Sequence, residues 1–122
     1  MRGIIMTAIL AAGTAQAETR LGAEQLDGLL TGNTVYLETP AGEAPVLYGA
    51  DGRAAALLPD GTALVGTWSI DADGYCIDWE NGPKGSCTRA TRMPGAIALT
   101  DAATGDPRGR ILRVVPGNPE DL

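Results

Sequence analysis

Turn-forming residues recur along this chain at intervals of about ten residues, and this spacing constrains its fold more than any other feature. Asp-Gly turns stand at 50–53, 59–62 and 71–74, and the run Asn-Gly-Pro-Lys-Gly follows at 81–85. The segments between them leave no room for long helices. The pattern predicts a mainly β fold, an antiparallel meander that forms a small barrel or sandwich.

The segments between the turns alternate apolar and polar residues, as half-buried strands do. We expect strands at 33–39, 46–50, 54–58, 64–70, 75–79, 85–90, 96–100 and 111–115, with loops at 41–45 and 104–109. The alternation puts Leu64, Gly66, Trp68 and Ile70 on one face, and Tyr75, Ile77 and Trp79 on another. These two faces should supply much of the core, while Asp78 and Glu80 point outward.

One short helix is expected near the start of the domain. Leu21, Leu26, Leu29 and Leu30 follow a helical stripe, and Gly32 stands where a C-terminal cap belongs. This helix should close one end of the β structure. At the other terminus, residues 117–122 are expected to form a frayed tail.

The N-terminus has the features of a secretory signal peptide. Arg2 is followed by an apolar run of about ten residues, and Ala15-Gln16-Ala17 places small residues at a cleavage site. The run is too short to span a bilayer. We expect a signal peptide over 1–17, a single domain over 18–122, no membrane anchor, and a periplasmic or secreted location.

The two cysteines, Cys76 and Cys87, flank the turn at 81–85. An oxidising compartment favours a disulfide between them, and two strands joined by this turn would place them opposite each other. A structural disulfide is the favoured interpretation. The alternative is a reactive or metal-binding pair, which lacks both CxxC spacing and any histidine.

The composition excludes several classes of function. Without histidine the chain has no Ser-His-Asp triad, no Cys-His dyad and no histidine zinc site. No glycine-rich nucleotide motif is present, so we expect no cofactor. Loss of Arg2 with the leader changes the net charge from −6 to −7, which argues against nucleic acid as a partner.

The acidic residues near the turn at 71–74 have two further interpretations. Asp71 and Asp73, with Glu80, match part of a calcium-loop spacing, but strands rather than helices flank them, so we predict no metal. Asp71, Asp73, Asp78 and Glu80 also cluster in sequence and could serve carboxylate-pair catalysis, although acids in turns are usually solvated. We therefore expect a protein that is not an enzyme.

Aromatic residues offer the best candidate binding surface. Trp68, Tyr75 and Trp79, together with Arg89 and Arg92, could line a pocket for a sugar or a small amphiphile. The alternative is that the aromatic rings fill the core, because the chain has no phenylalanine. The segment 106–109 is interpreted as a turn first, and as a recognition loop only second.

Five segments together resemble one family. They are GNTVY (32–36), YGADGR (48–53), GTWSID (66–71), YCIDWENGPKGSC (75–87) and TGDPRGR (104–110). The pattern is similar to that of small secreted proteins of Gram-negative bacteria that have no established activity. Some proteins with this pattern bear the name dihydrodipicolinate reductase, but such an enzyme needs a dinucleotide fold whose glycine fingerprint is missing here.

The predicted function is that of a monomeric, non-catalytic accessory or binding protein of the cell envelope. It would bind a small ligand or glycan through Trp68, Tyr75, Trp79 and Arg89. The first alternative is a protein-binding inhibitor or envelope adaptor that uses acidic loops. The second is a carboxylate-dependent enzyme.

Overall fold

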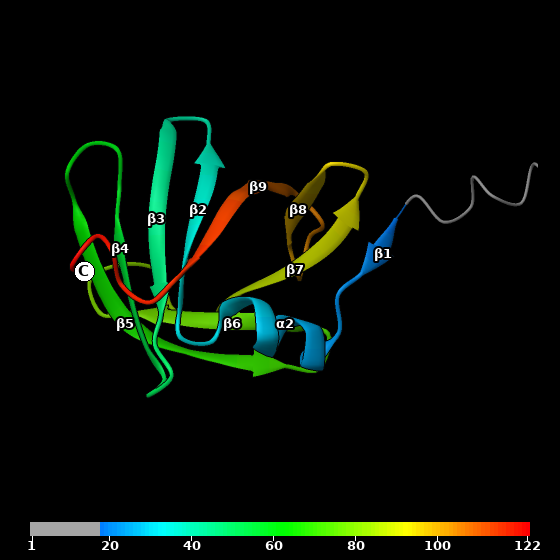
Figure 1. The fold of residues 1–122 in the computed structure, drawn as a ribbon, viewed down its shortest axis with the longest axis horizontal. Coiled ribbons are helices and arrows are strands. Elements are labelled where there is room, and N and C mark those ends of the chain that lie inside the picture. The colour runs from blue at the N-terminus through cyan, green and yellow to red at the C-terminus, as the bar shows by residue number, and fades with distance from the viewer. Residues whose placement is uncertain (1–17) are drawn as a thin grey trace, which may run out of the picture.

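The computed structural model describes residues 18–122, so the predicted signal peptide over 1–17 lies outside the described residues. One helix and nine strands make up the fold (Figure 1). In chain order they are β1 (Thr19–Arg20), α2 (Ala23–Leu30), β2 (Asn33–Thr39), β3 (Gly42–Tyr48), β4 (Arg53–Leu57), β5 (Ala63–Asp71), β6 (Gly74–Trp79), β7 (Ser86–Met93), β8 (Ala96–Asp101) and β9 (Pro107–Pro116).

The strands from β2 to β9 form a closed antiparallel barrel. Each pairs with the strand before it and the strand after it, and β9 returns to pair with β2. The short β1 adds to β7 through Thr19–Arg92 and Arg20–Thr91 pairs. The mainly β meander is therefore confirmed, and of the two predicted architectures the chain adopts the barrel.

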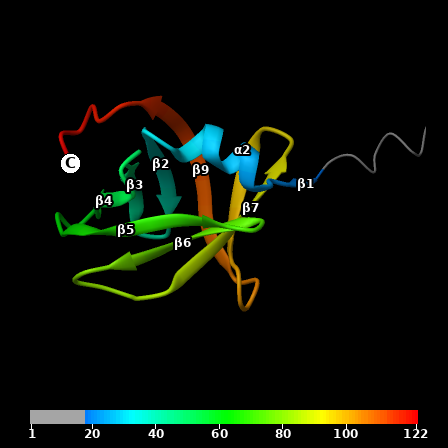
Figure 2. The same ribbon diagram turned by 90° about the horizontal axis from the view of Figure 1, so that it is seen from below.

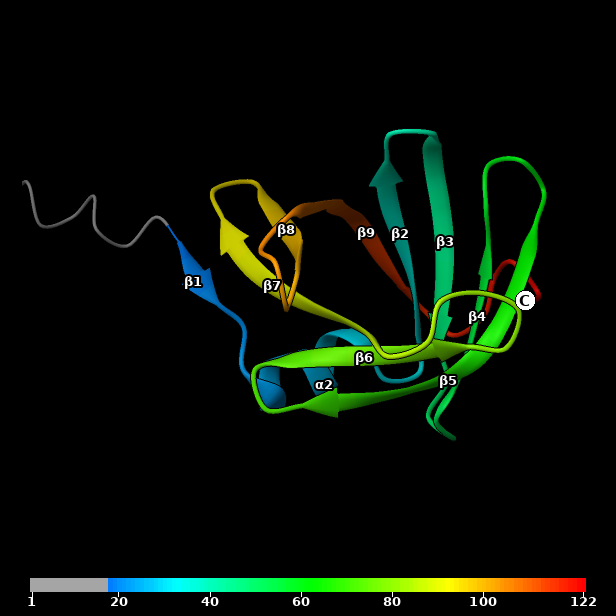
Figure 3. The same cartoon turned by 180° about the vertical axis from the view of Figure 1, so that it is seen from behind.

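The helix plugs one end of this barrel. Leu26 and Leu30 of α2 are fully buried, as is Leu21 just before it, and the helix contacts β2, β5 and β6. Figure 3 shows α2 behind the β5–β6 hairpin. The helix ends as expected, because Gly32 has a φ of +79° that glycine adopts without strain.

The predicted faces of β5 and β6 do supply much of the core. Tyr75, Ile77 and Trp79 are buried, and Trp68 and Ile70 pack against them. Asp78 and Glu80 are exposed, as the alternation predicts. Strand period therefore determines which side chains of these two strands enter the barrel.

Two predicted loops are wrong, because strands extend into both. Residues 42–45 belong to β3, where Pro45 pairs with Tyr36 of β2. Pairing with β4 begins only at Val46, so Pro45 lies where β3 has one neighbour and where a missing N–H is tolerated. In the other case, β9 already begins at Pro107.

The disulfide is confirmed. Cys76 of β6 pairs directly with Cys87 of β7, and their Cα atoms are 3.9 Å apart. The Cys87 carbonyl accepts a hydrogen bond from the Ala102 N–H, away from β6. The bridge joins two positions that alternate with inward-facing Tyr75 and Ile77, so it lies on the outer surface of the barrel.

The C-terminal segment is held against the barrel, in contrast to the frayed tail that we expected over 117–122. Gly117 N–H donates to the Gly32 carbonyl, and the Tyr36 hydroxyl donates to Glu120 at 2.6 Å. Asn118 exchanges two hydrogen bonds with Leu122. Figure 2 shows this segment leaving β9 on the side of the barrel that α2 occupies.

Candidate ligand-binding cavity

The end of the barrel opposite α2 holds a cavity of about 190 Å³. Some of its lining residues, such as Thr39, Leu58 and Ser86, lie beside the β2–β3, β4–β5 and β6–β7 connections. Its lining is Leu37, Thr39, Ala44, Val46, Tyr48, Ala56, Leu58, Leu64, Tyr75, Ile77, Trp79, Ser86, Thr88, Leu99 and Arg108. Most of these side chains are apolar, and three of the polar ones, Ser86, Thr88 and Arg108, contact one another. We call this space the barrel cavity.

Two tyrosines lie deepest in the barrel cavity. The rings of Tyr48 and Tyr75 meet edge to face with centroids 5.5 Å apart, and the Tyr48 hydroxyl donates to the Tyr75 hydroxyl across 3.5 Å. Burial raises the pKa of Tyr48 well above its usual value. Burial also raises the pKa of Tyr75, although its hydrogen bonds to Tyr48 and Thr88 and the charge of Arg108 oppose the shift. Both hydroxyls are therefore neutral.

Among residues 18–122, Arg108 is the one charged side chain that lines the cavity. Its Nη1 donates to Ser86 Oγ at 2.6 Å and to Thr88 Oγ1 at 3.2 Å, and its Nη2 pairs with the Asp101 carboxylate. The side chain is 33% exposed, so the guanidinium lies at the mouth. The two hydrogen bonds and the ion pair together fix the orientation of the planar guanidinium group.

Asp101 is itself held in place from outside the cavity. Its Oδ1 accepts hydrogen bonds from the backbone N–H groups of Ala103 at 2.8 Å and Thr104 at 3.1 Å. These two bonds, followed by the contact with Arg108, lower the pKa of Asp101. The carboxylate is ionised at neutral pH, and it anchors Arg108 without lining the cavity.

The structure separates the four residues predicted to bind ligand. Tyr75 and Trp79 line the barrel cavity. Trp68 does not; it packs edge to face on Tyr48 at 5.2 Å, and its Nε1 donates to the Gly49 carbonyl. Arg89 lies outside the barrel, with its Nε 3.7 Å from Asp73. The core interpretation therefore applies to Trp68, and the lining of the cavity includes Tyr75 and Trp79.

Arg108 was assigned to a loop by the sequence, and a β-bulge explains why. The β8–β9 register passes from Leu99–Gly109 to Thr100–Pro107, which leaves Arg108 without a partner on β8. Gly109 has a φ of +109°, and a Cβ there would lie 2.2 Å from the Glu38 carbonyl oxygen. The glycine allows β9 to approach β2 and turns Arg108 inward. In the sequence, Gly109 was the one indication that a bulge could turn Arg108 inward.

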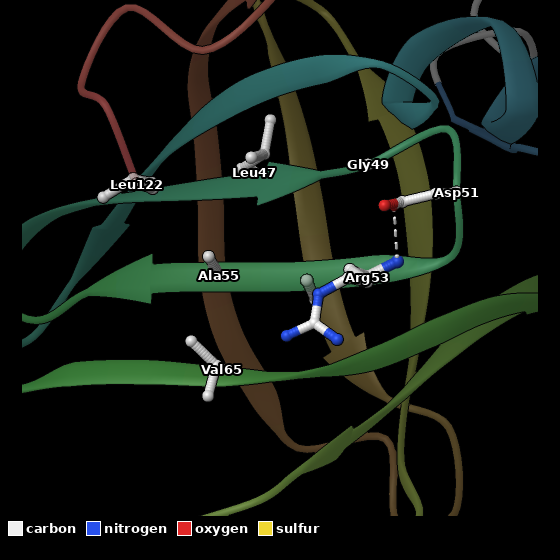
Figure 4. Close-up of a pocket in the computed structure, with 8 residues that line it drawn as sticks. Leu47, Gly49, Asp51, Arg53, Ala55, Val65 and Leu122 are labelled. Carbon is white, nitrogen blue, oxygen red and sulfur yellow. Dashed lines mark hydrogen bonds between the residues drawn. The ribbon is translucent and has the colours of Figure 1, made fainter.

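A second hollow lies on the outer surface of the barrel (Figure 4). It has a volume of about 270 Å³ and runs across β3, β4 and β5. Leu47, Ala55 and Val65 form a cross-strand row, and Arg53 and Leu122 flank it. Its lining contains no aromatic ring, so it resembles the grooved outer face of a sheet more than a site for a small molecule.

One group of possible metal ligands exists within residues 18–122. It consists of Asp71, Cys76 and Cys87, whose ligand atoms lie within 4.8 Å of one another. Both sulfur atoms belong to the disulfide, so neither is a thiolate that could bind a metal. Asp73, part of the calcium-like spacing, instead pairs with Arg20 and Arg89.

Comparison with protein-family models, curated proteins and solved structures finds no match to this chain. In the part of the chain that the structure describes, no helix has the length and apolar character needed to cross a membrane. The residues that line the barrel cavity are therefore the main indication of function.

The side chains that line the barrel cavity offer apolar contacts and a few hydrogen-bonding groups. Its lining combines apolar walls, an indole, neutral hydroxyls and one oriented guanidinium. Among residues 18–122, the side chains that line it include no carboxylate and no thiol. A ligand could therefore pack its apolar part inside and make hydrogen bonds near the mouth, but no paired acid and base face it there.

Proposed function

We propose that the protein is a non-catalytic binding protein that takes one small amphiphilic ligand into the barrel cavity. The observation that supports this most directly is a half-open apolar cavity with an oriented arginine at its mouth. Protein interiors leave few voids larger than a water molecule, because side chains normally fill them. A cavity of this size that the side chains leave open is therefore a reason to expect a ligand.

The volume limits the size of the ligand. An engineered apolar cavity of about 150 Å³ binds benzene, and the barrel cavity is slightly larger at about 190 Å³. It therefore suits a single ring or a short chain. A longer glycan could place only one terminal unit inside.

We further propose that the protein acts in the periplasm or outside the cell, as a monomeric accessory protein of the envelope. The disulfide is compatible with an oxidising compartment, and the leader-like N-terminus favours export. Neither observation identifies a partner, so the ligand is the part of this proposal that is tested first.

Tryptophan fluorescence tests the proposal, because one of the two tryptophans lines the cavity and the other does not. In a Trp68→Phe variant, single-ring and short-chain amphiphiles should shift the emission of Trp79. In the matched Trp79→Phe variant, the same compounds should leave the emission of Trp68 nearly unchanged. A flat response of the Trp68→Phe variant at millimolar concentrations would count against the proposal.

The second hollow, on the outer surface of β3, β4 and β5, supports a second candidate function, that of a protein-binding inhibitor or adaptor. Val65 is 39% exposed and Leu57 is 37% exposed, both on the outside of the barrel. A Val65→Asp variant should then lose a protein partner while it keeps ligand binding in the cavity. If Val65→Asp instead lost ligand binding with its fold intact, the two surfaces would not be independent.

A further inference from the structure

The barrel cavity has an uneven distribution of charge and hydrogen-bonding groups. Its walls are mostly apolar, and among the described residues its single formal charge is the positive charge of Arg108. The nearest carboxylate, Asp101, lies behind the guanidinium and is neutralised in part by two backbone N–H groups. A ligand therefore meets the cation and not the anion.

Arg108 retains donors that its protein partners do not use. A guanidinium has five N–H groups. Three are used by Ser86, Thr88 and Asp101. Within the described residues, the Nε–H and one Nη2–H have no acceptor. Nε and Nη2 are neighbouring nitrogen atoms of the guanidinium, and the two oxygen atoms of a carboxylate are suited to accept from both.

We infer that the ligand of the barrel cavity is a small carboxylic acid, bound as its anion, with its apolar body against Trp79 and its carboxylate on Arg108. This inference rests on the proposed function and specifies its ligand class. A neutral alcohol or amide presents a single acceptor atom to these two donors, so it leaves one N–H unpaired.

The rest of the molecule strengthens the dependence on this one residue. The mature chain is acidic, so its overall field does not attract anions. Arg110, two residues along β9, lies outside the barrel with its Nε 2.5 Å from Glu38 Oε1. Anion binding in the cavity should thus require Arg108 and be indifferent to Arg110.

Two pairs of nearly isosteric probes test the inference, benzoate with benzamide and hexanoate with hexanamide. Calorimetry with the disulfide-bonded protein should show each carboxylate binding about tenfold to a hundredfold more tightly than its amide. An Arg108→Gln variant should lose that preference, because carboxylate binding should fall by a larger factor than amide binding. Arg108→Lys, which keeps the charge without the fork, should retain part of the preference.

Arg110→Gln is the matched control, because it removes the same charge from the outer face of the same strand. It should leave both affinities unchanged. Thermal melts verify that each variant is folded, and amide binding reports whether the cavity survives the loss of Arg108.

The outcomes separate this inference from the proposed function. If amides bind as tightly as carboxylates, or if Arg108→Gln keeps the preference, the carboxylate assignment is overturned and small-ligand binding stands. If neither carboxylates nor amides bind, and Trp79 emission is also flat for neutral amphiphiles, both are overturned.

Discussion

Removing the disulfide should destabilise the barrel by an amount that the loop length sets. Cys76 and Cys87 are 11 residues apart, and the loop-closure entropy for a loop of this size corresponds to about 3 kcal/mol at 25 °C. For a domain of about 100 residues, this lowers the Tm by about 12–24 °C. The barrel should still form, because β6 also pairs with β5 through six residue pairs.

The assay compares urea unfolding of the wild type, the wild type reduced by a phosphine, and a Cys76→Ala/Cys87→Ala variant. The reduced protein and the double variant should lose similar free energies of unfolding. Reduction should leave the double variant itself unaffected, which makes it the control for side effects of the reductant.

A loss below about 1 kcal/mol in both samples would refute the loop-closure reasoning, since strain in the native bridge would then offset most of the entropy gain. A loss of the barrel itself, seen by circular dichroism, would refute the view that pairing with β5 holds β6 in place.

Three other perturbations test separate parts of the structure. Ala56→Leu adds three carbon atoms to the cavity wall. It should stabilise the fold by up to about 2 kcal/mol and abolish ligand binding, because the larger side chain fills the space. If calorimetry shows unchanged binding, the ligand binds elsewhere. Gly109→Ala puts a Cβ 2.2 Å from the Glu38 carbonyl oxygen, so it should cost about 3 kcal/mol or more in urea melts. Gly105→Ala, with positive φ but open space, should cost only about 1 kcal/mol, and equal costs would contradict the role of Gly109 in the β9–β2 contact. Burial raises the pKa of Tyr48 and Tyr75. The stability that the two neutral hydroxyls contribute is therefore full below pH 10 and is lost as pH rises through their folded-state pKa values. Ultraviolet titration that shows both tyrosines ionised at pH 10 in the folded protein would contradict the raised pKa values.

The strands were predictable because their physical signals are local. Alternation and Asp-Gly turns suffice to place β2, β5 and β6 and to show that Tyr75, Ile77 and Trp79 face inward. The disulfide followed from the turn between its cysteines. The choice between barrel and sandwich was not local, because it depends on whether the last strand returns to the first long strand.

The site was harder to predict for the same reason. Trp79 could be assigned to the inner face, but whether that face was filled or hollow depends on side chains from seven other strands. Arg108 was missed because a bulge breaks the period of two just before Gly109. Arg89 was misplaced as a lining residue, although Thr88 and Ala90 on the same strand are buried and alternation puts Arg89 outside.

The antiparallel barrel has one seam that joins distant parts of the chain. Every other neighbouring pair from β2 to β9 consists of consecutive strands joined by a short connection. The seam between β2 and β9 instead pairs residues 33–38 with residues 110–116, so it spans nearly the whole barrel in sequence. Without this pairing, β2 and β9 would be open edges of an eight-stranded sheet, so the β2–β9 contact is what removes the exposed edges.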